Sequence, residues 1–285
     1  MAIEGGHLSD YDPVLKSKLQ GEAARIIRAF GFAGAHVIII GGLVPSLLVP
    51  KVEVGLEPHI GTTDLDLCLS VALVEGDVGA YDRLEKCLRD AGFEMTREDG
   101  KSISWRWIGG KGAQVTVEFF CSMAEGREPG RLHRPGGVVG GKLSALVLAT
   151  GGLIDRDFRI VELEVDLPDG GGRTKQQFRV AGPAAYLAAK ADALRRRNKN
   201  KDAYDLVWLA ECWPGGQTAL ATEIKGSAIF SDLKDTLDIL REEFATIDAA
   251  GAVKYGRFMA SDSGGRDAAA QRAVGAFRAL LSALA

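Results

Sequence analysis

A short apolar run that ends in two glycines constrains the fold of this chain more than any other feature. Val37 to Ile40 are all apolar, which predicts a short buried strand. Gly41 and Gly42 follow directly, and glycine permits a tight turn that lets the backbone approach phosphate groups closely. Many α/β proteins also end a buried strand in glycine, so the turn alone predicts an α/β fold and not a phosphate site.

Two acids give this turn a chemical context. They lie in the segment 62–67, which reads Thr-Thr-Asp-Leu-Asp-Leu, and the leucines predict the buried face of a strand. Side chains two residues apart on a strand point to the same face, so Asp64 and Asp66 can hold one divalent cation together. An ordinary half-exposed strand shows the same alternation. The order of the segments favours a metal and nucleoside triphosphate site: apolar strand, two glycines, short helix, acids.

A third acid lies on the next candidate for a partner strand. Residues 114–120 read Gln-Val-Thr-Val-Glu-Phe-Phe, which predicts a strand that carries Glu118. A single glutamate on a strand usually faces solvent. If this strand lies beside the strand of Asp64, however, Glu118 completes a group of three carboxylates. Two magnesium ions and a triphosphate would balance that charge during phosphoryl or nucleotidyl transfer.

The other segments before residue 181 alternate between helical and strand patterns. We predict helices over 15–30, 43–49 and 78–91, strands over 93–96 and 103–108, and a hairpin over 157–180. The hairpin carries Glu162 and Glu164, which alternate as Asp64 and Asp66 do. No glycine turn leads into its first strand, so we expect these two glutamates on the surface.

A partial P-loop match lies between these segments. Residues 136–142 fit the first seven positions of the pattern, but the eighth is Leu143 in place of the Ser or Thr that binds magnesium. The preceding residues are polar and include Pro135, so the required buried strand is missing. We therefore expect Lys142 on a loop or at the start of a helix over 143–149.

From Gly182 onward the pattern becomes helical, which predicts an α/β domain over 1–180 and a helical domain over 181–285. Helices are predicted over 184–197, 201–211, 232–244 and 267–284. On the second of them, Lys201, Asp202 and Asp205 can face the same way, as in an ordinary surface salt bridge. Five basic residues predict a local positive face that could meet a polyphosphate or an RNA backbone. They are Arg195, Arg196, Arg197, Lys199 and Lys201.

Composition limits the classes of protein that remain. The chain has 285 residues, of which 46% are hydrophobic, enough for one large or two smaller globular domains. Its formal net charge of -3 argues against a protein that coats nucleic acid non-specifically. The four cysteines have no paired spacing, so we expect reduced thiols and no zinc site. No apolar run is long enough for a bilayer, and we expect a soluble cytoplasmic protein without a membrane partner.

Together these motifs resemble a known family. Gly41-Gly42, the Thr-Thr-Asp-Leu-Asp run, Glu118, and two helical runs are similar to AbiEii-type nucleotidyltransferases, a branch of the DNA polymerase β-like superfamily. The helical runs are Lys-x-x-Ala-Leu-x-x-Arg from Lys190 and Lys-Asp-x-x-Asp-Leu from Lys201. The resemblance covers about residues 15–212. Members of this family are often toxins of type IV toxin-antitoxin systems.

The resemblance implies a nucleotidyltransferase core with a mixed sheet and a C-terminal all-helical domain. It also implies transfer of a nucleoside monophosphate from a nucleoside triphosphate to an acceptor hydroxyl, with Mg²⁺ or Mn²⁺ as cofactor. The acceptor would be the end of tRNA or another RNA, a protein or a small molecule, and a cognate antitoxin would be a partner. The implied residue roles are metal binding by Asp64, Asp66 and Glu118, catalysis by Asp64, Asp66 and Lys190, and nucleotide binding by Gly41, Gly42, Thr62, Thr63, Lys190, Lys201, Asp202 and Asp205. The helical residues would form the second wall of a cleft.

One position departs from the family pattern. Relatives often have an arginine two residues before the first threonine, where this chain has Ile60, preceded by His59. We interpret His59 as an exposed loop histidine. The departure leaves two alternatives open: a weak or inactive member that binds nucleotide or a protein partner, and a small-molecule nucleotidyltransferase of the antibiotic-modifying type.

Overall fold

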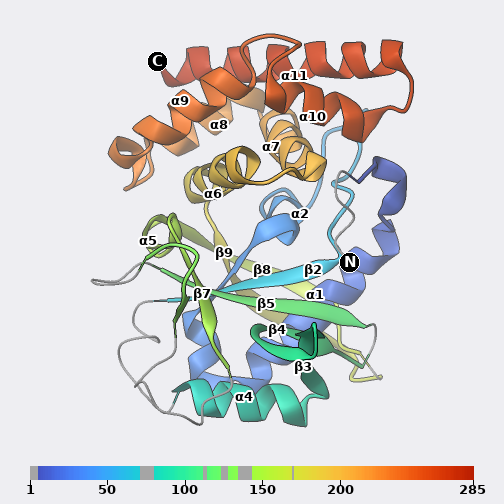
Figure 1. Ribbon diagram of the computed structural model, residues 1–285, viewed down its shortest axis with the longest axis vertical. Helices are drawn as coiled ribbons and strands as arrows, with labels where there is room; N and C mark the ends of the chain where they lie inside the picture. Colours follow the sequence, from blue (N-terminus) through green and yellow to red (C-terminus); the bar gives the residue numbers. More distant parts are fainter. Residues whose placement is uncertain (1–5, 71–79, 112–113, 123–127, 134–142, 169) are drawn as a thin grey trace. The chain divides into compact units, whose positions relative to one another are not determined.

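The computed structural model describes residues 6–70, 80–111, 114–122, 128–133, 143–168 and 170–285 (Figure 1). The partial P-loop match over 136–142 lies outside these residues. The described chain divides into two compact units. One unit contains residues 13–44 and 61–181, and we call it the sheet unit. The other contains residues 1–12, 45–60 and 182–285, and we call it the helical unit.

The sheet unit is built on strands and a few helices. Its strands are β1 Val37–Ile40, β2 Asp64–Leu69, β3 Phe93–Glu98, β4 Lys101–Gly109, β5 Val115–Ser122, β6 Leu132–His133, β7 Ala145–Leu148, β8 Phe158–Asp166 and β9 Arg173–Ala181. Its helices are α1 Pro13–Ala29, α4 Ala80–Asp90 and α5 Gly151–Ile154, with short 3-10 helices η2 Gly31–His36 and η3 Gly41–Leu43.

The described strands form one mixed sheet in the order β3-β4-β5-β2-β1-β9-β8, with β7 beside β5 and β6 beside β7. The β1 strand lies between antiparallel β2 and parallel β9, and its residues are buried throughout. Burial on both faces explains its all-apolar sequence. The helices α1 and α4 contact each other and pack on the sheet, α1 against β8 and β2 and α4 against β3.

The helical unit contains the C-terminal helices. They are α6 Pro183–Arg196, α7 Asn200–Cys212, α8 Gly216–Lys225, α9 Lys234–Glu243, α10 Ala250–Met259 and α11 Ser263–Leu284. The unit also holds most of α2 Val44–Leu48 and the 3-10 helices η1 Leu8–Asp10 and η5 Phe230–Asp232. Pro183 begins α6, where its fixed φ suits the first turn and its missing N–H costs nothing.

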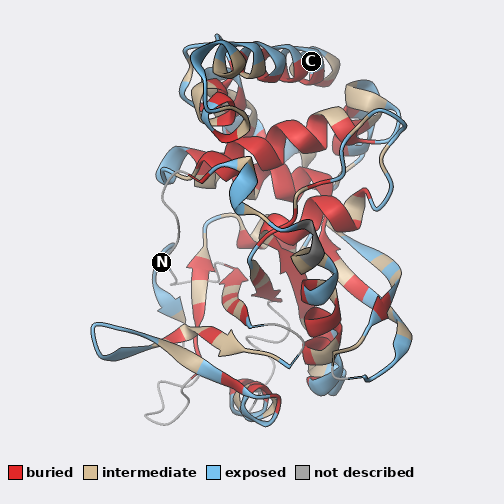
Figure 2. Cartoon of the chain, turned by 90° about the vertical axis from the view of Figure 1, so that its right-hand side faces the viewer, coloured by how far each residue is buried: buried red, intermediate tan, exposed pale blue. Residues whose placement is uncertain are grey.

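The α7 helix is the centre of this unit, since it contacts α6, α8, α10 and α11. Almost all of its residues are buried, whereas the C-terminal helix α11 is exposed along its outer side (Figure 2). The central position explains why α7 is not a simple amphipathic helix. Its charged residues must therefore find partners inside the unit.

The predicted fold class, a mixed α/β core with C-terminal helices, is confirmed. One predicted helix is wrong: residues 145–148 of the expected 143–149 helix form strand β7, parallel to β5. Ala-Leu-Val-Leu is too short to distinguish a strand from a helix by its pattern, and the neighbouring edge of β5 decides the outcome. The helices α8 and α10 were not predicted.

Candidate metal and nucleotide site

Three strands place charged side chains in one row across the sheet. Asp66 of β2 lies directly opposite Glu118 of β5 in a parallel pairing. On the other side of β5, Arg106 of β4 lies opposite Glu118 in an antiparallel pairing. Residues at facing positions of neighbouring strands project to the same side of the sheet. Asp64 lies two residues before Asp66 and shares its face.

The predicted convergence of the three acids is present. One carboxylate oxygen from each of Asp64, Asp66 and Glu118 lies within 4.8 Å of the other two. All three residues are half-buried, so they are partly shielded and still accessible to a ligand. Three carboxylate oxygens are hard donors of the kind that Mg²⁺ and Mn²⁺ prefer. The donor set therefore fits the divalent cation expected at this position.

The glycine turn leaves room for one of these carboxylates. Gly41 follows β1 and has a φ of +71°, a conformation that side chains rarely adopt. A Cβ at this position would overlap the carboxylate of Asp66. Gly41 is therefore required twice, for the backbone conformation and for the space that Asp66 occupies. Gly42 is the next residue and is buried.

The two threonines before the acids differ in position. Thr62 is buried and donates its hydroxyl to Oδ1 of Asp64 at 2.6 Å. This bond orients the Asp64 carboxylate. Thr63 is exposed, so its hydroxyl is accessible from solvent. The structure thus gives Thr62 a role in holding Asp64, and leaves Thr63 as the threonine that a ligand can reach.

An arginine at the site was not predicted. Arg106 donates its Nε to Oε1 of Glu118 at 2.7 Å, and its guanidinium lies 4.8 Å from the centre of the Trp105 ring. The sequence predicted the strand over 103–108, but an arginine on a strand gives no signal of its own. Only the register between β4 and β5 identifies it, because that register places Arg106 beside Glu118.

The predicted residues on the helices form a separate cluster, which we call the helical ion cluster. It consists of Lys190 on α6, Lys201, Asp202 and Asp205 on α7, and Arg197 between these helices. Lys190 Nζ lies 2.8 Å from Asp202 and 2.6 Å from Asp205, and Lys201 Nζ lies 2.6 Å from Asp205. Arg197 donates to both oxygens of Asp202. Both lysines and both aspartates are buried, so these pairs are internal.

The cluster shifts the titration of its own members. Burial alone would raise the pKa of Asp202, but Lys190 and Arg197 outweigh burial and lower that pKa to about 2. The pKa of Lys190 is raised, because Asp202 and Asp205 more than offset the effect of burial. Burial lowers the pKa of Lys201, with Lys190 adding to the effect.

His59 belongs to the same cluster, and the expectation of an exposed loop histidine is wrong. The residue is 2% exposed and its Nε2 lies 3.0 Å from Oδ1 of Asp205. Its ring contacts the rings of Tyr204 and Trp208. Burial lowers the pKa of His59 to about 4, against the opposing effect of Asp205. No local pattern in the sequence indicates this burial, because the aromatic residues that contact His59 lie far along the chain.

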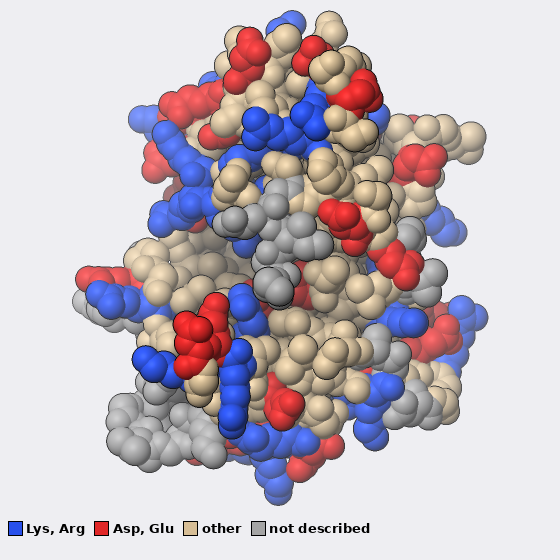
Figure 3. Space-filling model, turned by 45° about the vertical axis from the view of Figure 1, so that its right-hand side comes forward, with Lys and Arg blue, Asp and Glu red and all other residues tan. Residues whose placement is uncertain are grey.

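The predicted positive face is largely neutralised. Arg195 pairs with Glu242 and Arg196 with Asp192, while Arg197 and Lys201 belong to the helical ion cluster. On the face shown in Figure 3, groups of Lys and Arg alternate with groups of Asp and Glu.

The predicted surface position of the two hairpin glutamates is confirmed, because Glu162 and Glu164 are both exposed. All four cysteines are free, and no disulfide links them.

The predicted site residues thus form two groups. Gly41, Gly42, Thr62, Thr63, Asp64, Asp66 and Glu118 belong to the sheet unit, and Lys190, Lys201, Asp202 and Asp205 belong to the helical unit. Each group is brought together within its own unit. Their joint action on a nucleotide stays a prediction. Within the described residues, no helix is both long and apolar enough to cross a bilayer.

The sequence of this chain also matches a known protein family. The model of the nucleotidyl transferase AbiEii toxin family, type IV toxin-antitoxin system, matches residues 62–282. Curated proteins gave no significant match.

Two solved structures are similar to this chain. JHP933 from Helicobacter pylori is 14% identical, with a TM-score of 0.40, over 95% of this chain and 93% of that one. An antigenic nucleotidyltransferase-like protein from Paracoccidioides brasiliensis is 18% identical, with a TM-score of 0.37, over 76% of this chain and 93% of that one.

The family match includes Asp64, Asp66, Glu118 and the helical ion cluster apart from His59, and it spans well over half of the chain. It is consistent with the row of carboxylates on β2 and β5. The chain therefore belongs to the AbiEii nucleotidyl transferase toxin family of type IV toxin-antitoxin systems.

Proposed function

We propose that this chain transfers a nucleoside monophosphate from a nucleoside triphosphate to an acceptor hydroxyl in a reaction that requires Mg²⁺ or Mn²⁺. The observation that carries the proposal is the convergence of three carboxylates, within 4.8 Å of one another, directly beside the Gly41 turn. A divalent cation held there would supply charge neutralisation for the phosphates and would lower the pKa of the attacking hydroxyl.

The residues of the sheet unit have distinct roles in this proposal. Asp64, Asp66 and Glu118 hold the cation, and Thr62 keeps Asp64 in position through its 2.6 Å bond. The Gly41-Gly42 turn and the exposed Thr63 receive the triphosphate. The acceptor oxygen forms a bond to the α-phosphorus, and the bond from that phosphorus to the bridging oxygen breaks. Pyrophosphate leaves, and the hydroxyl proton passes to solvent or to a carboxylate.

The helical ion cluster has a charge that suits a role with nucleotides. Lys190, Lys201 and Arg197 carry three positive charges against two from Asp202 and Asp205, while His59 is neutral near pH 7 because its pKa is about 4. We propose that the resulting excess of positive charge attracts the triphosphate. Direct contact would require Lys190 or Lys201 to exchange a carboxylate partner for a phosphate, since both lysines are buried and ion-paired.

For the acceptor we propose the end of an RNA, with tRNA as the first candidate. Transfer of a nucleotide to the end of an RNA would alter that RNA and would account for the action of a toxin. A cognate antitoxin that opposes this action is the proposed protein partner. These assignments rest on the family, and the site itself supports only the transfer chemistry.

The decisive experiment is a transfer assay with the purified chain. Each α-labelled nucleoside triphosphate is incubated with Mg²⁺ or Mn²⁺, total tRNA and a set of small hydroxyl acceptors. We expect label on RNA with at least one triphosphate, and its loss in Asp64→Asn. The matched control is Glu162→Gln, which removes an exposed acid from an alternating strand of the same sheet. Label on a small acceptor alone would move the proposal to antibiotic-type substrates.

Absence of transfer requires a second measurement. Binding of Mn²⁺ and of a non-hydrolysable triphosphate to the wild-type chain should be lost in Asp64→Asn if the site is built as proposed. Binding that persists unchanged in this variant, without transfer to any acceptor, would overturn the metal site and the reaction together.

A further inference from the structure

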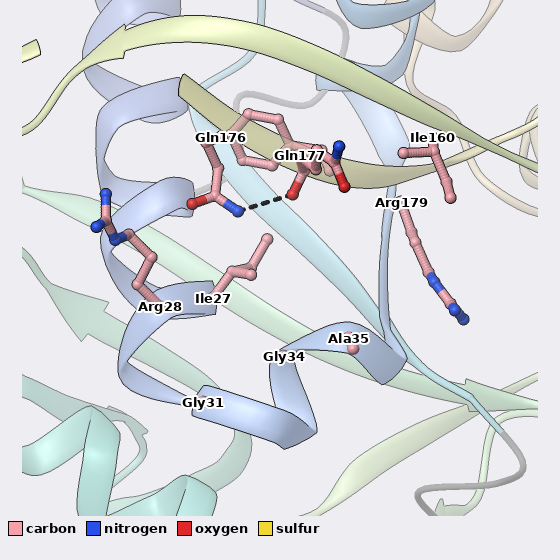
Figure 4. Close-up of a pocket in the computed structure, with 10 residues that line it drawn as sticks. Ile27, Arg28, Gly31, Gly34, Ala35, Ile160, Gln176, Gln177 and Arg179 are labelled. Atoms are coloured by element: carbon pink, nitrogen blue, oxygen red, sulfur yellow. Dashed lines mark hydrogen bonds between the residues drawn. The ribbon is translucent and has the colours of Figure 1, made fainter. Parts of the chain in front are cut away.

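A slot in the sheet unit lies beside an incompletely paired stretch of β9. It is a hollow of about 380 Å³, within the size range of ligand sites, and it lies between the end of α1, the η2 helix and the β8–β9 hairpin (Figure 4). Consecutive residues of β9, from Gln176 to Arg179, all line it. Consecutive strand residues point to opposite faces of a sheet, so a hollow that touches all of them must lie along the edge of the strand.

The pairing of β9 explains this edge. β8 accompanies β9 along its whole length, from Arg173 to Ala181. β1, on the other side, pairs with it only at Arg179 and Val180. The earlier residues of β9 therefore extend beyond the beginning of β1 at Val37. In the described chain, no strand covers this side of residues 173–178.

The register determines which backbone groups face the slot. At the end of the hairpin Leu167 donates its N–H to the carbonyl of Gly172, and antiparallel pairing then makes every second residue of β9 bond to β8. The intervening residues, which include Lys175 and Gln177, direct their N–H and C=O groups away from β8. Among the described residues, the donors to these two carbonyls are local side chains: Thr174 Oγ1 for Lys175 at 3.4 Å, and Gln176 Nε2 for Gln177 at 2.7 Å.

The charges at the slot favour a negatively charged ligand. Arg28 and Arg179 lie at its two ends, with Gln176 and Gln177 between them (Figure 4). Arg28 donates to Thr174, and Arg179 lies over the ring of Phe158. Among the described residues neither arginine has a carboxylate partner, although the chain as a whole is acidic. The floor is apolar where Ile27 and Ile160 line it, and Ile160 is 63% exposed.

We propose that this slot binds an extended, acidic segment of a partner protein, which adds to β9 as a short strand. The segment would donate to the carbonyls of Lys175 and Gln177 and accept from their N–H groups, displacing the two local side-chain donors. Its acidic side chains would meet Arg28 and Arg179. Main-chain pairing supplies affinity and the flanking side chains supply specificity in such strand addition.

This binding would be independent of the proposed catalytic reaction. β9 is parallel to β1, and the slot lies before the first residue of β1. The carboxylates lie at the other end of β1, where Ile40 pairs with Asp66 and Gly41 follows. A peptide in the slot would therefore leave the metal site open. An Asp66→Asn variant should lose metal binding and keep peptide binding.

The test uses a labelled peptide in which glutamate and valine alternate. Its length of about six residues is that of a usual strand. Three comparison probes are a lysine-valine peptide, the glutamate-valine peptide with alternate backbone amides methylated, and an oligouridylate. We expect the glutamate-valine peptide to bind best by fluorescence anisotropy. It should slow hydrogen exchange at the amides of Lys175 and Gln177, whereas those of Thr174 and Gln176 already bond to β8 and should change little.

Variants of the chain separate charge from strand pairing. Arg28→Glu and Arg179→Glu should each weaken binding of the glutamate-valine peptide by about tenfold, since negative charges on the protein and the peptide would then face each other. Gln177→Pro should abolish binding because it removes an N–H that faces the slot, and proline is tolerated at such edge positions. The matched control is Arg257→Glu, an exposed charge reversal on α10. Circular dichroism confirms that each variant is folded.

Three results would overturn the proposal. Equal binding of the methylated peptide would exclude strand pairing. Preferred binding of the oligouridylate, with the same sensitivity to the arginine variants, would assign the slot to RNA. Absence of any peptide binding up to about 1 mM, the weak end of specific affinities, would exclude a peptide site.

Discussion

The row of carboxylates on β2 and β5 and the helical ion cluster use the same kinds of residue in opposite ways. Asp64, Asp66 and Glu118 are half-buried, and their oxygens lie close enough to repel one another. Asp202 and Asp205 are fully buried, and each has two cationic partners. The first arrangement has Arg106 beside three carboxylates and gains from an added cation. The second already contains three cations for its two carboxylates. Exposure and partner charge, more than residue type, distinguish a site prepared for a ligand from a group that supports the fold.

The largest expected effect concerns stability. Asp205→Asn leaves Lys190 and Lys201 buried without one of their carboxylates, and breaking a buried pair in this way costs roughly 3–5 kcal/mol. Asp66→Asn is the matched change in the other region, and it relieves repulsion. Its free energy of unfolding should change by less than about 1 kcal/mol. Urea unfolding of both variants measures the contrast, and similar losses would refute the division into a supporting and a ligand-ready group.

The next effect is a pH dependence that arises in the helical ion cluster. The pKa of His59 is lowered by burial to about 4, from 6.5 in the unfolded chain. Between these values the unfolded state binds a proton and the folded state does not, so stability rises with pH in this window and is lost as pH falls toward 4. At about 1.4 kcal/mol per pH unit, lowering the pH from 7 to 4.5 should cost roughly 2–3 kcal/mol through His59.

The comparison variant for this pH effect is His59→Gln. Glutamine keeps an amide donor for Asp205 and has no proton to gain, so its free energy of unfolding should fall less over the same pH range. The exposed His7 serves as the control position, and His7→Gln should behave as the wild type does. Equal pH dependence in all three proteins would mean that His59 is not held neutral by burial.

The third effect concerns the metal. Asp66→Asn should weaken Mn²⁺ binding by at least about 100-fold, since loss of supporting residues around a metal already costs 10- to 100-fold. Titration calorimetry without nucleotide measures this directly. Asp205→Asn, examined at a temperature where it stays folded, should bind Mn²⁺ as the wild type does. Loss of Mn²⁺ binding in a folded Asp205 variant would contradict the assignment of the metal to the sheet unit.

Local sequence patterns predicted part of the carboxylate row. The strand over 37–40 and the two acids of β2 were predicted because alternation and glycine are local signals. Glu118 was predicted on the condition that its strand lies beside that of Asp64, and the pairing of β2 with β5 meets this condition. The roles of these residues with metal and nucleotide stay predictions.

Other features depended on contacts that no local pattern contains. Arg106 reaches Glu118 only through the register of β4 on β5, and the burial of His59 depends on Tyr204 and Trp208, which lie far along the chain. The sequence of β7 is too short to distinguish strand from helix, and the adjacent edge of β5 determines its conformation. Long-range pairing therefore accounts for each of these errors and omissions.

The smallest effect tests Arg106, a cation that lies in the row itself. Arg106 lies 2.7 Å from Glu118 and is 37% exposed, so its charge competes with a bound metal ion but is screened by water. Arg106→Gln should therefore tighten Mn²⁺ binding by up to about fivefold. This change in affinity corresponds to the free energy of an exposed ion pair. Arg173→Gln, which removes an exposed cross-strand cation near Glu164, is the matched control and should have no effect. Weaker binding in Arg106→Gln would mean that the arginine orients Glu118 for the metal. The Arg106–Glu118 ion pair would then support the local structure, as the ion pairs of the helical ion cluster do, even though Arg106 is partly exposed.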